Sequence, residues 1–114
     1  MDIEKSFVSN WNMQMKKGLL IFLVMNVIKK KNCYGYEIIQ KIEEKTGIII
    51  ADGTLYPLLK KLKYNKLVLT RWEVNEEDAP RKYYFLTGTG NSVLQNMNTY
   101  WGNLNQSVFS LIQE

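Results

Sequence analysis

Two short runs rich in β-branched and aromatic residues restrict the fold more than any other feature of the chain. The first is VLTRWEV at residues 68–74, the second is RKYYFLT at residues 81–87, and NEEDAP separates them. Asn75 and Pro80 are turn residues, so the two runs predict a β-hairpin. The remaining long segments show helical spacing, which predicts a mainly α chain with one two-stranded β-element.

Three helices are expected before the hairpin. The first covers residues 12–31, whose middle is apolar on nearly all sides, as in a helix buried between others. The second covers residues 36–45 and ends at Gly47. The third begins near Asp52, a favourable N-cap residue. Pro57 is expected close to its first turn, because a proline deeper in a helix breaks a hydrogen bond.

The third helix is predicted to have two different faces. Its leucines recur at spacings of three and four and are expected to face the core: Leu55, Leu58, Leu59 and Leu62. The opposite half carries hydroxyl and ammonium groups, with Tyr56 at its margin. Lysines can meet phosphates, and Thr and Tyr can reach base edges. This half is therefore either a solvated surface or a surface that contacts nucleic acid.

The distribution of charge favours a polyanionic partner without requiring one. The net charge is +4, and residues 1–67 hold 12 Lys and Arg against 6 Asp and Glu. Residues 68–114 hold 3 against 5, so the whole surplus lies in the first segment. A basic surplus of this kind suits nucleic acid, although many soluble domains match it without such a partner.

A last helix is expected over roughly residues 88–113, with Thr87 as its cap. Apolar residues follow it at alternating spacings of three and four, as in a heptad seam: Leu94, Met97, Trp101, Leu104, Val108 and Leu111. No charged side chain occurs in residues 83–113, whereas a solvated helix normally carries charge on its outer face. The missing charge favours a subunit interface, although an ordinary core stripe has the same spacing.

The residues needed for catalysis and metal binding are scarce. The chain has no histidine, the usual general base and zinc ligand, and its one cysteine cannot build a thiolate metal site. The glycines of TGTGNS lack the following lysine of a phosphate-binding loop. We therefore expect no enzyme activity, no catalytic residues, no metal and no cofactor.

The sequence also bears on location. A single cysteine, Cys33, fits a reducing compartment. The longest apolar run, residues 19–25, is far too short to span a bilayer. The opening residues MDIEKSF carry acids and lack the apolar core of a secretory signal. A cytoplasmic protein with no membrane partner is expected.

Three short helices followed by a two-stranded wing form the layout of a winged helix, a relative of the helix-turn-helix. Residues 1–87 are predicted to form this DNA-binding domain, and residues 88–114 a long C-terminal dimerisation helix. In this layout the third helix enters the major groove. The predicted function is sequence-specific DNA binding in transcription regulation. The alternative is a winged-helix module that senses a ligand or binds protein without specific DNA binding.

Three stretches of the chain carry a family likeness. YGYEIIQKI at residues 34–42, DGTLYPLLKKL at residues 52–62 and APRKYYFLTGTG at residues 79–90 resemble the PadR family of bacterial transcriptional regulators. The short length with one C-terminal helix is similar to the compact branch of that family. The resemblance implies a winged-helix homodimer that binds a roughly palindromic operator in double-stranded DNA, usually as a repressor.

The resemblance also implies an effector. Some compact members bind flat aromatic compounds between tryptophans of their last helices, and Trp101 occupies the corresponding place. A planar aromatic ligand at Trp101 and Met97 would then release the repressor from DNA. An interface anchor explains Trp101 equally well. Because the last helix lacks acidic groups, neutral or anionic ligands are favoured over cations, although a cation–π contact leaves that open.

Eight residues are predicted to contact DNA. They lie at the start of the second helix, on the outer face of the third and in the returning strand: Tyr34, Tyr36, Thr54, Tyr56, Lys60, Lys61, Arg81 and Lys82. Those of the third helix would read the major groove, with Lys61 on a phosphate. The wing cations would meet a phosphate or a minor groove. Alternatively, they pair with the acids of NEED, whose charges repel the DNA backbone.

Overall fold

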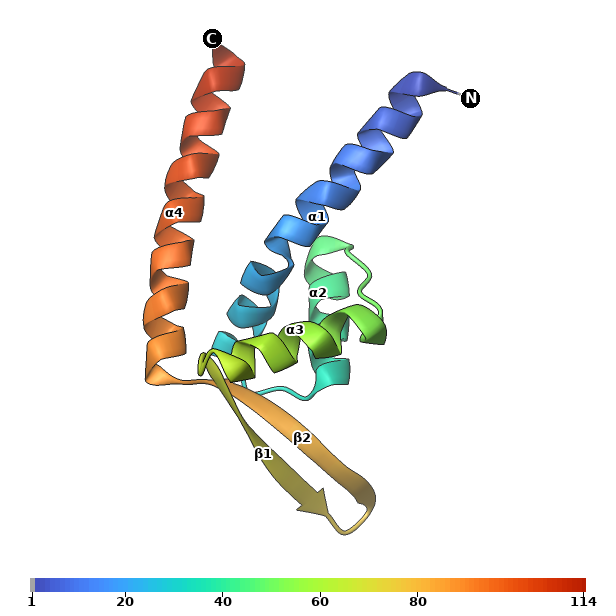
Figure 1. The fold of residues 1–114 in the computed structure, drawn as a ribbon, viewed down its shortest axis with the longest axis vertical. Coiled ribbons are helices and arrows are strands. Elements are labelled where there is room, and N and C mark those ends of the chain that lie inside the picture. The colour runs from blue at the N-terminus through green and yellow to red at the C-terminus, as the bar shows by residue number, and fades with distance from the viewer. Residues whose placement is uncertain (1) are drawn as a thin grey trace.

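The computed structural model describes residues 2–114, which form four helices and one antiparallel hairpin (Figure 1). The elements are α1 (Ile3–Lys30), α2 (Gly35–Thr46), α3 (Asp52–Tyr64), β1 (Val68–Asn75), β2 (Asp78–Leu86) and α4 (Gly88–Gln113). This order confirms the predicted mainly α chain with a two-stranded wing. The first half of α1 and most of α4 extend away from the domain and diverge from each other (Figure 1).

The core lies where the second half of α1 meets α2, α3, the base of the hairpin and the start of α4. Its fully buried side chains come from all of these elements: Val24, Met25, Ile28, Ile38, Ile42, Leu55, Leu59, Leu62, Val68 and Leu94. Burying one such side chain contributes about 1.5–3 kcal/mol. The predicted inward face of α3 is confirmed, with Leu58 half-buried at its edge.

The first helix is longer than the sequence prediction of residues 12–31. It begins at Ile3 because the Asp2 carboxylate accepts hydrogen bonds from the backbone N–H groups of Glu4 (3.1 Å) and Lys5 (3.4 Å). Ile3, Phe7 and Trp11 recur at spacings of four, a helical signal that the prediction missed. Even so, none of the helices in residues 2–114 combines the length and apolar content needed to cross a bilayer.

Two details of α3 also differ from prediction. Ala51, not Asp52, is the N-cap residue, and Asp52 instead places its negative charge in the first turn, which suits the helix dipole. Pro57 is the sixth helical residue, in the second turn rather than the first. Its missing N–H leaves the carbonyl of Gly53 without a helical donor. Both residues are exposed, so water can replace the lost hydrogen bond.

The hairpin strands extend further towards their turn than expected. β2 begins at Asp78, so Pro80 lies in a strand and was wrongly assigned to the turn. A proline is tolerated there because each strand of a two-stranded ribbon has an unpaired edge. The register runs from Val68 opposite Leu86 to Glu73 opposite Arg81. A separate bridge joins Cys33 to Tyr84 and brings the segment before α2 alongside the outer edge of β2.

A short joint fixes the start of α4 to the end of α3. The Thr87 hydroxyl accepts a hydrogen bond from the Gly90 N–H (2.9 Å) and donates one to the Lys66 carbonyl (2.7 Å), so the predicted cap is confirmed. The Thr87 N–H donates to the Leu67 carbonyl (3.0 Å). A side chain at Gly90 would collide with that carbonyl oxygen, which explains the glycine.

Gly90→Ala is therefore expected to lower the free energy of unfolding by about 1–3 kcal/mol, the usual cost of overpacking. In a helix without such a collision, replacing glycine with alanine stabilises by about 1 kcal/mol. The sign of the change in unfolding free energy therefore distinguishes a collision from the ordinary helix preference. Urea unfolding measures the change. Gly88→Ala is the matched control, because a β-carbon there meets nothing within 4 Å. Equal stability of the two variants would contradict the close approach.

The Cys33 thiol is buried and donates a hydrogen bond to the Lys31 carbonyl at 3.1 Å. Burial, followed by the negative charge of Glu37, raises the pKa of Cys33 above its ordinary value. Burial and Tyr56 likewise raise the pKa of Tyr84. Both groups are neutral when protonated, so the native state resists their ionisation.

This shift predicts a loss of stability in alkali. The contribution of a raised acid pKa is fully present below the unfolded value and is lost as the pH rises towards the folded value. The free energy of unfolding of the wild-type protein should thus decrease between about pH 7 and about pH 10. The decrease over the same range should be smaller for the Cys33→Ala variant. Urea titrations at the two pH values measure both. An equal alkaline loss in Cys33→Ala would contradict the role of the thiol.

Candidate nucleic-acid interface

The outer face of α3 is a polar surface supported by a buried apolar one. Leu55 and Leu59 are at most 1% exposed, so they hold the helix to the domain. Thr54, Lys60 and Lys61 lie on the exposed side, as predicted. Within residues 2–114, neither lysine ammonium group takes part in a hydrogen bond or an ion pair. The two charges are therefore available to an external anion.

Tyr56 lies at the margin of this face and contacts α2. Its side chain is 47% exposed, and its hydroxyl end lies over Gly35, the first residue of α2. A β-carbon at Gly35 would collide with that hydroxyl. The glycine between Tyr34 and Tyr36 therefore lets α2 and α3 approach closely, and Tyr56 is partly occupied with this packing.

Arg81 lies in the half of β2 nearer the wing tip and is held there by Tyr34. Its Nη1 donates a hydrogen bond to the Tyr34 hydroxyl at 3.1 Å, and its guanidinium carbon lies 4.5 Å from the centre of the Tyr34 ring. Tyr83 packs edge-on against Tyr34, with ring centres 5.4 Å apart. A hydrogen bond and a cation–π contact on one guanidinium restrict its orientation. The sequence predicted Tyr34 and Arg81 as separate DNA contacts and did not pair them, and it did not single out Tyr83.

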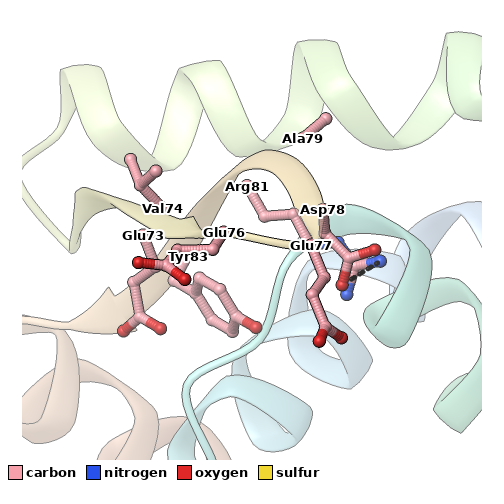
Figure 2. Close-up of a pocket in the computed structure, with 8 residues that line it drawn as sticks. All are labelled: Glu73, Val74, Glu76, Glu77, Asp78, Ala79, Arg81 and Tyr83. Carbon is pink, nitrogen blue, oxygen red and sulfur yellow. Dashed lines mark ion pairs between the residues drawn. The ribbon is translucent and has the colours of Figure 1, made fainter.

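Arg81 also faces the acidic tip of the wing. Its Nη2 lies 4.0 Å from the Asp78 carboxylate, the ion pair that Figure 2 marks with a dashed line. The alternative expectation that wing cations pair with the acids of NEED thus holds for Arg81. Lys82 is half-buried instead and lies 5.9 Å from the centre of the Tyr84 ring.

The predicted phosphate-binding tyrosines differ in their surroundings. Tyr34 is half-buried, and besides contacting Arg81 its backbone N–H donates to the Glu37 carboxylate at 3.2 Å. Tyr36 is 59% exposed, and its hydroxyl accepts a hydrogen bond from Gln40 at 2.9 Å. Tyr36 therefore presents a hydroxyl to solvent, whereas the Tyr34 hydroxyl is already used inside the domain.

Comparison with known proteins agrees with this arrangement. The sequence pattern of the PadR-like transcriptional regulator family matches residues 24–96. A PadR-like transcription factor from Bacteroides fragilis is 40% identical, with 90% of this chain and 98% of that chain covered and a TM-score of 0.74. A PadR family regulator from Eggerthella lenta is 30% identical, with 96% of this chain and 95% of that chain covered and a TM-score of 0.83. This chain belongs to the PadR-like family.

PadR-like proteins are transcriptional regulators, so membership implies DNA-binding regulation and not enzyme activity. A further PadR-like regulator, from Bacillus cereus, is 30% identical over 89% of this chain and 98% of that one, with a TM-score of 0.82. These neighbours confirm the predicted winged-helix fold. They also agree with the family resemblance read from the three sequence stretches.

The PadR-like chain exposes a large amount of apolar surface on its two diverging helices. On α1 and α4 the apolar residues that are more than half exposed are Ile3, Phe7, Val8, Trp11, Tyr100, Phe109, Leu111 and Ile112. Of the predicted heptad seam, Trp101, Leu104 and Val108 are about 40% exposed. Leu94 must be removed from the predicted interface, because it lies near the start of α4 and is fully buried in its own domain.

A mainly apolar cleft of about 500 Å³ lies between α1 and α4 of this PadR-like chain. Trp101 and Met97 line it, together with Phe22, which the sequence reading did not single out. The rings of Phe22 and Trp101 lie 5.9 Å apart and are tilted by 47°. Phe22 was missed because it occurs inside a nearly continuous apolar run, where no spacing distinguishes a lining residue from a core residue.

Proposed function

We propose that this protein represses transcription by binding a roughly palindromic operator as a homodimer in the cytoplasm. The observation that supports this most is the outer face of α3, where Thr54, Lys60 and Lys61 are exposed and the lysines lack partners within residues 2–114. In a winged helix this face enters the major groove. Lys61 meets a phosphate, while Thr54 and Lys60 reach base edges, with Tyr56 beside them.

The flanking contacts come from α2 and the wing. Tyr36 donates its exposed hydroxyl to a phosphate, and Arg81 reaches a second phosphate from the position that Tyr34 fixes for it. Tyr34 thus serves in the proposal mainly as a support for Arg81. Lys82 lies further into the domain and adds positive potential beside the backbone.

The homodimer is supported by the exposed apolar side chains of α1 and α4. Exposed apolar surface of this extent marks interaction sites, because exposing it to water is unfavourable. In the proposed dimer, Met97, Trp101, Leu104, Val108 and Leu111 face a second copy of the chain. Two-fold symmetry then presents two α3 helices to two half-sites about 34–36 Å apart.

A gel-shift titration with the DNA upstream of the protein's own gene tests this function. Retardation at low salt, together with two protected half-sites in a footprint, is the expected result. A reporter driven by the same DNA should be expressed less when the protein is present. If no retardation appears at low salt, the alternative of a module that senses a ligand or binds protein without specific DNA binding is supported instead.

We also propose that a planar aromatic molecule binds at Trp101 and Met97 and releases the DNA. The cleft beside these residues supports this, because its lining is mostly apolar and the Phe22 and Trp101 rings offer surfaces for stacking. With no acidic side chain in residues 83–113, a neutral or anionic compound fits better than a cation. Binding between the α4 helices would change the spacing of the two α3 helices.

Tryptophan fluorescence tests the effector. Planar aromatic compounds should quench the emission of the wild-type protein, and Trp101→Phe should lose most of the saturable quenching. Trp72→Phe is the control, because Trp72 lies on the wing and is 62% exposed. Saturable quenching that survives in Trp101→Phe would contradict the assignment.

A further inference from the structure

The guanidinium of Arg81 is bounded on several sides. Tyr34 covers one face of the group and accepts a hydrogen bond from Nη1. The carboxylate of Asp78 lies 4.0 Å from Nη2, at the wing tip (Figure 2). Arg81 and Asp78 are each about half exposed, with 44% and 51% of their side chains accessible. The edge of Arg81 that a DNA phosphate would occupy is therefore already next to an anion.

The surroundings of this pair are strongly acidic. A cleft of about 480 Å³ at the wing tip is lined by Glu73, Val74, Glu76, Glu77, Asp78, Ala79, Arg81 and Tyr83. Arg81 is the one cation among these lining residues. Four carboxylates around one guanidinium oppose the approach of DNA, as the sequence already suggested for the NEED tip.

We propose that Asp78 acts as an internal substitute for a DNA phosphate. In the free protein it occupies the edge of Arg81, and on binding a phosphate of the backbone displaces it. Carboxylate and phosphate both match the planar fork of a guanidinium, so the exchange needs no change in the Tyr34 contact. This inference rests on the proposed DNA-binding function. It adds to that function a contact inside the protein that competes with DNA for Arg81.

The position of Asp78 makes the exchange feasible. The pair is exposed and its atoms are at the outer limit of an ion pair, so it is weak and opens easily. Tyr34 keeps the guanidinium in place while the carboxylate leaves. The competition lowers the affinity for DNA of any sequence, because phosphate contacts carry no sequence information.

The experiment compares two wing-tip variants on a mixed-sequence duplex by fluorescence anisotropy at fixed salt. Asp78→Asn and Glu76→Gln each remove one negative charge from the same cleft, but the ion pair of Arg81 is with Asp78. We expect Asp78→Asn to bind about two- to fivefold tighter, the range that an exposed ion pair supplies. Glu76→Gln should gain clearly less. In an Arg81→Gln background the Asp78→Asn gain should disappear.

Each other outcome has a defined meaning. Equal gains from Asp78→Asn and Glu76→Gln would reduce the effect to the general potential of the tip and overturn the inference. So would an Asp78→Asn gain that persists in the Arg81→Gln background. If the wild-type protein binds no duplex at low salt, the proposed DNA-binding function is wrong, and the inference that depends on it is wrong as well. Circular dichroism checks that the wild-type protein and all four variants are folded.

Discussion

Replacing both Lys60 and Lys61 with alanine is expected to weaken DNA binding about 5-fold if one of them meets a phosphate, and about 30-fold if both do, at about 0.15 M salt. Each lysine–phosphate contact releases counterions, which contributes about 0.9 to the slope of log affinity against log salt. The slope of the variant should therefore be shallower by about 0.9 to 1.8. Because the lysines have no partners inside residues 2–114, their loss leaves no unpaired group behind.

A salt titration of the operator duplex and of a mixed-sequence duplex measures this effect. The matched control is the double variant Lys16→Ala/Lys17→Ala. It removes the same charge from an exposed part of α1 that lies outside the proposed DNA interface. The control should keep its slope and lose little affinity. If the two double variants lose the same slope, then net charge and not the α3 face determines binding.

Leu55→Ala is expected to lower the free energy of unfolding by about 2–5 kcal/mol, because it removes a fully buried side chain and leaves a cavity. Small domains are stable by only about 5–15 kcal/mol, so this is a large share of the total. The cavity would form under the first turns of α3, at the point where the helix is anchored to the core. DNA binding should weaken as a consequence of lost order in α3.

Urea unfolding at one fixed protein concentration measures the change, since dimerisation would make stability depend on concentration. Leu58→Ala is the control within the same helix, because Leu58 is half-buried and its removal leaves a smaller cavity. We expect less than half of the Leu55→Ala loss. Equal losses for the two variants would mean that α3 is not anchored by its inner face.

The sequence allowed the order of the elements to be predicted because each has a local signal. Thr87 accepts a hydrogen bond from the N–H of Gly90, as a cap does, and Gly47 ends α2 with a positive φ of 75°. The leucines of α3 separate its inner from its outer face by spacing alone. These features depend on neighbours within a few residues, which is why a sequence reveals them.

The contacts around Arg81 depend instead on pairing between distant segments. Tyr34 and Arg81 are 47 residues apart, and they meet because the bridge between Cys33 and Tyr84 places the start of α2 along β2. No spacing rule predicts that bridge. Leu94 was assigned to the dimer seam for a related reason, because a heptad stripe does not reveal which of its turns lies against the chain's own core.

The joint at Thr87 ties the start of α4 to the segment that follows α3. Thr87 bonds to Lys66 and Leu67, which directly follow α3, and Gly90 lies against the Leu67 carbonyl. The 26 residues of α4 extend about 39 Å from this joint. If α4 tilts by a few degrees at this joint, its far end moves by several ångströms. In the proposed dimer, we therefore expect a change in the packing of Trp101 and its neighbours along α4 to change the angle between α4 and the DNA-binding domain.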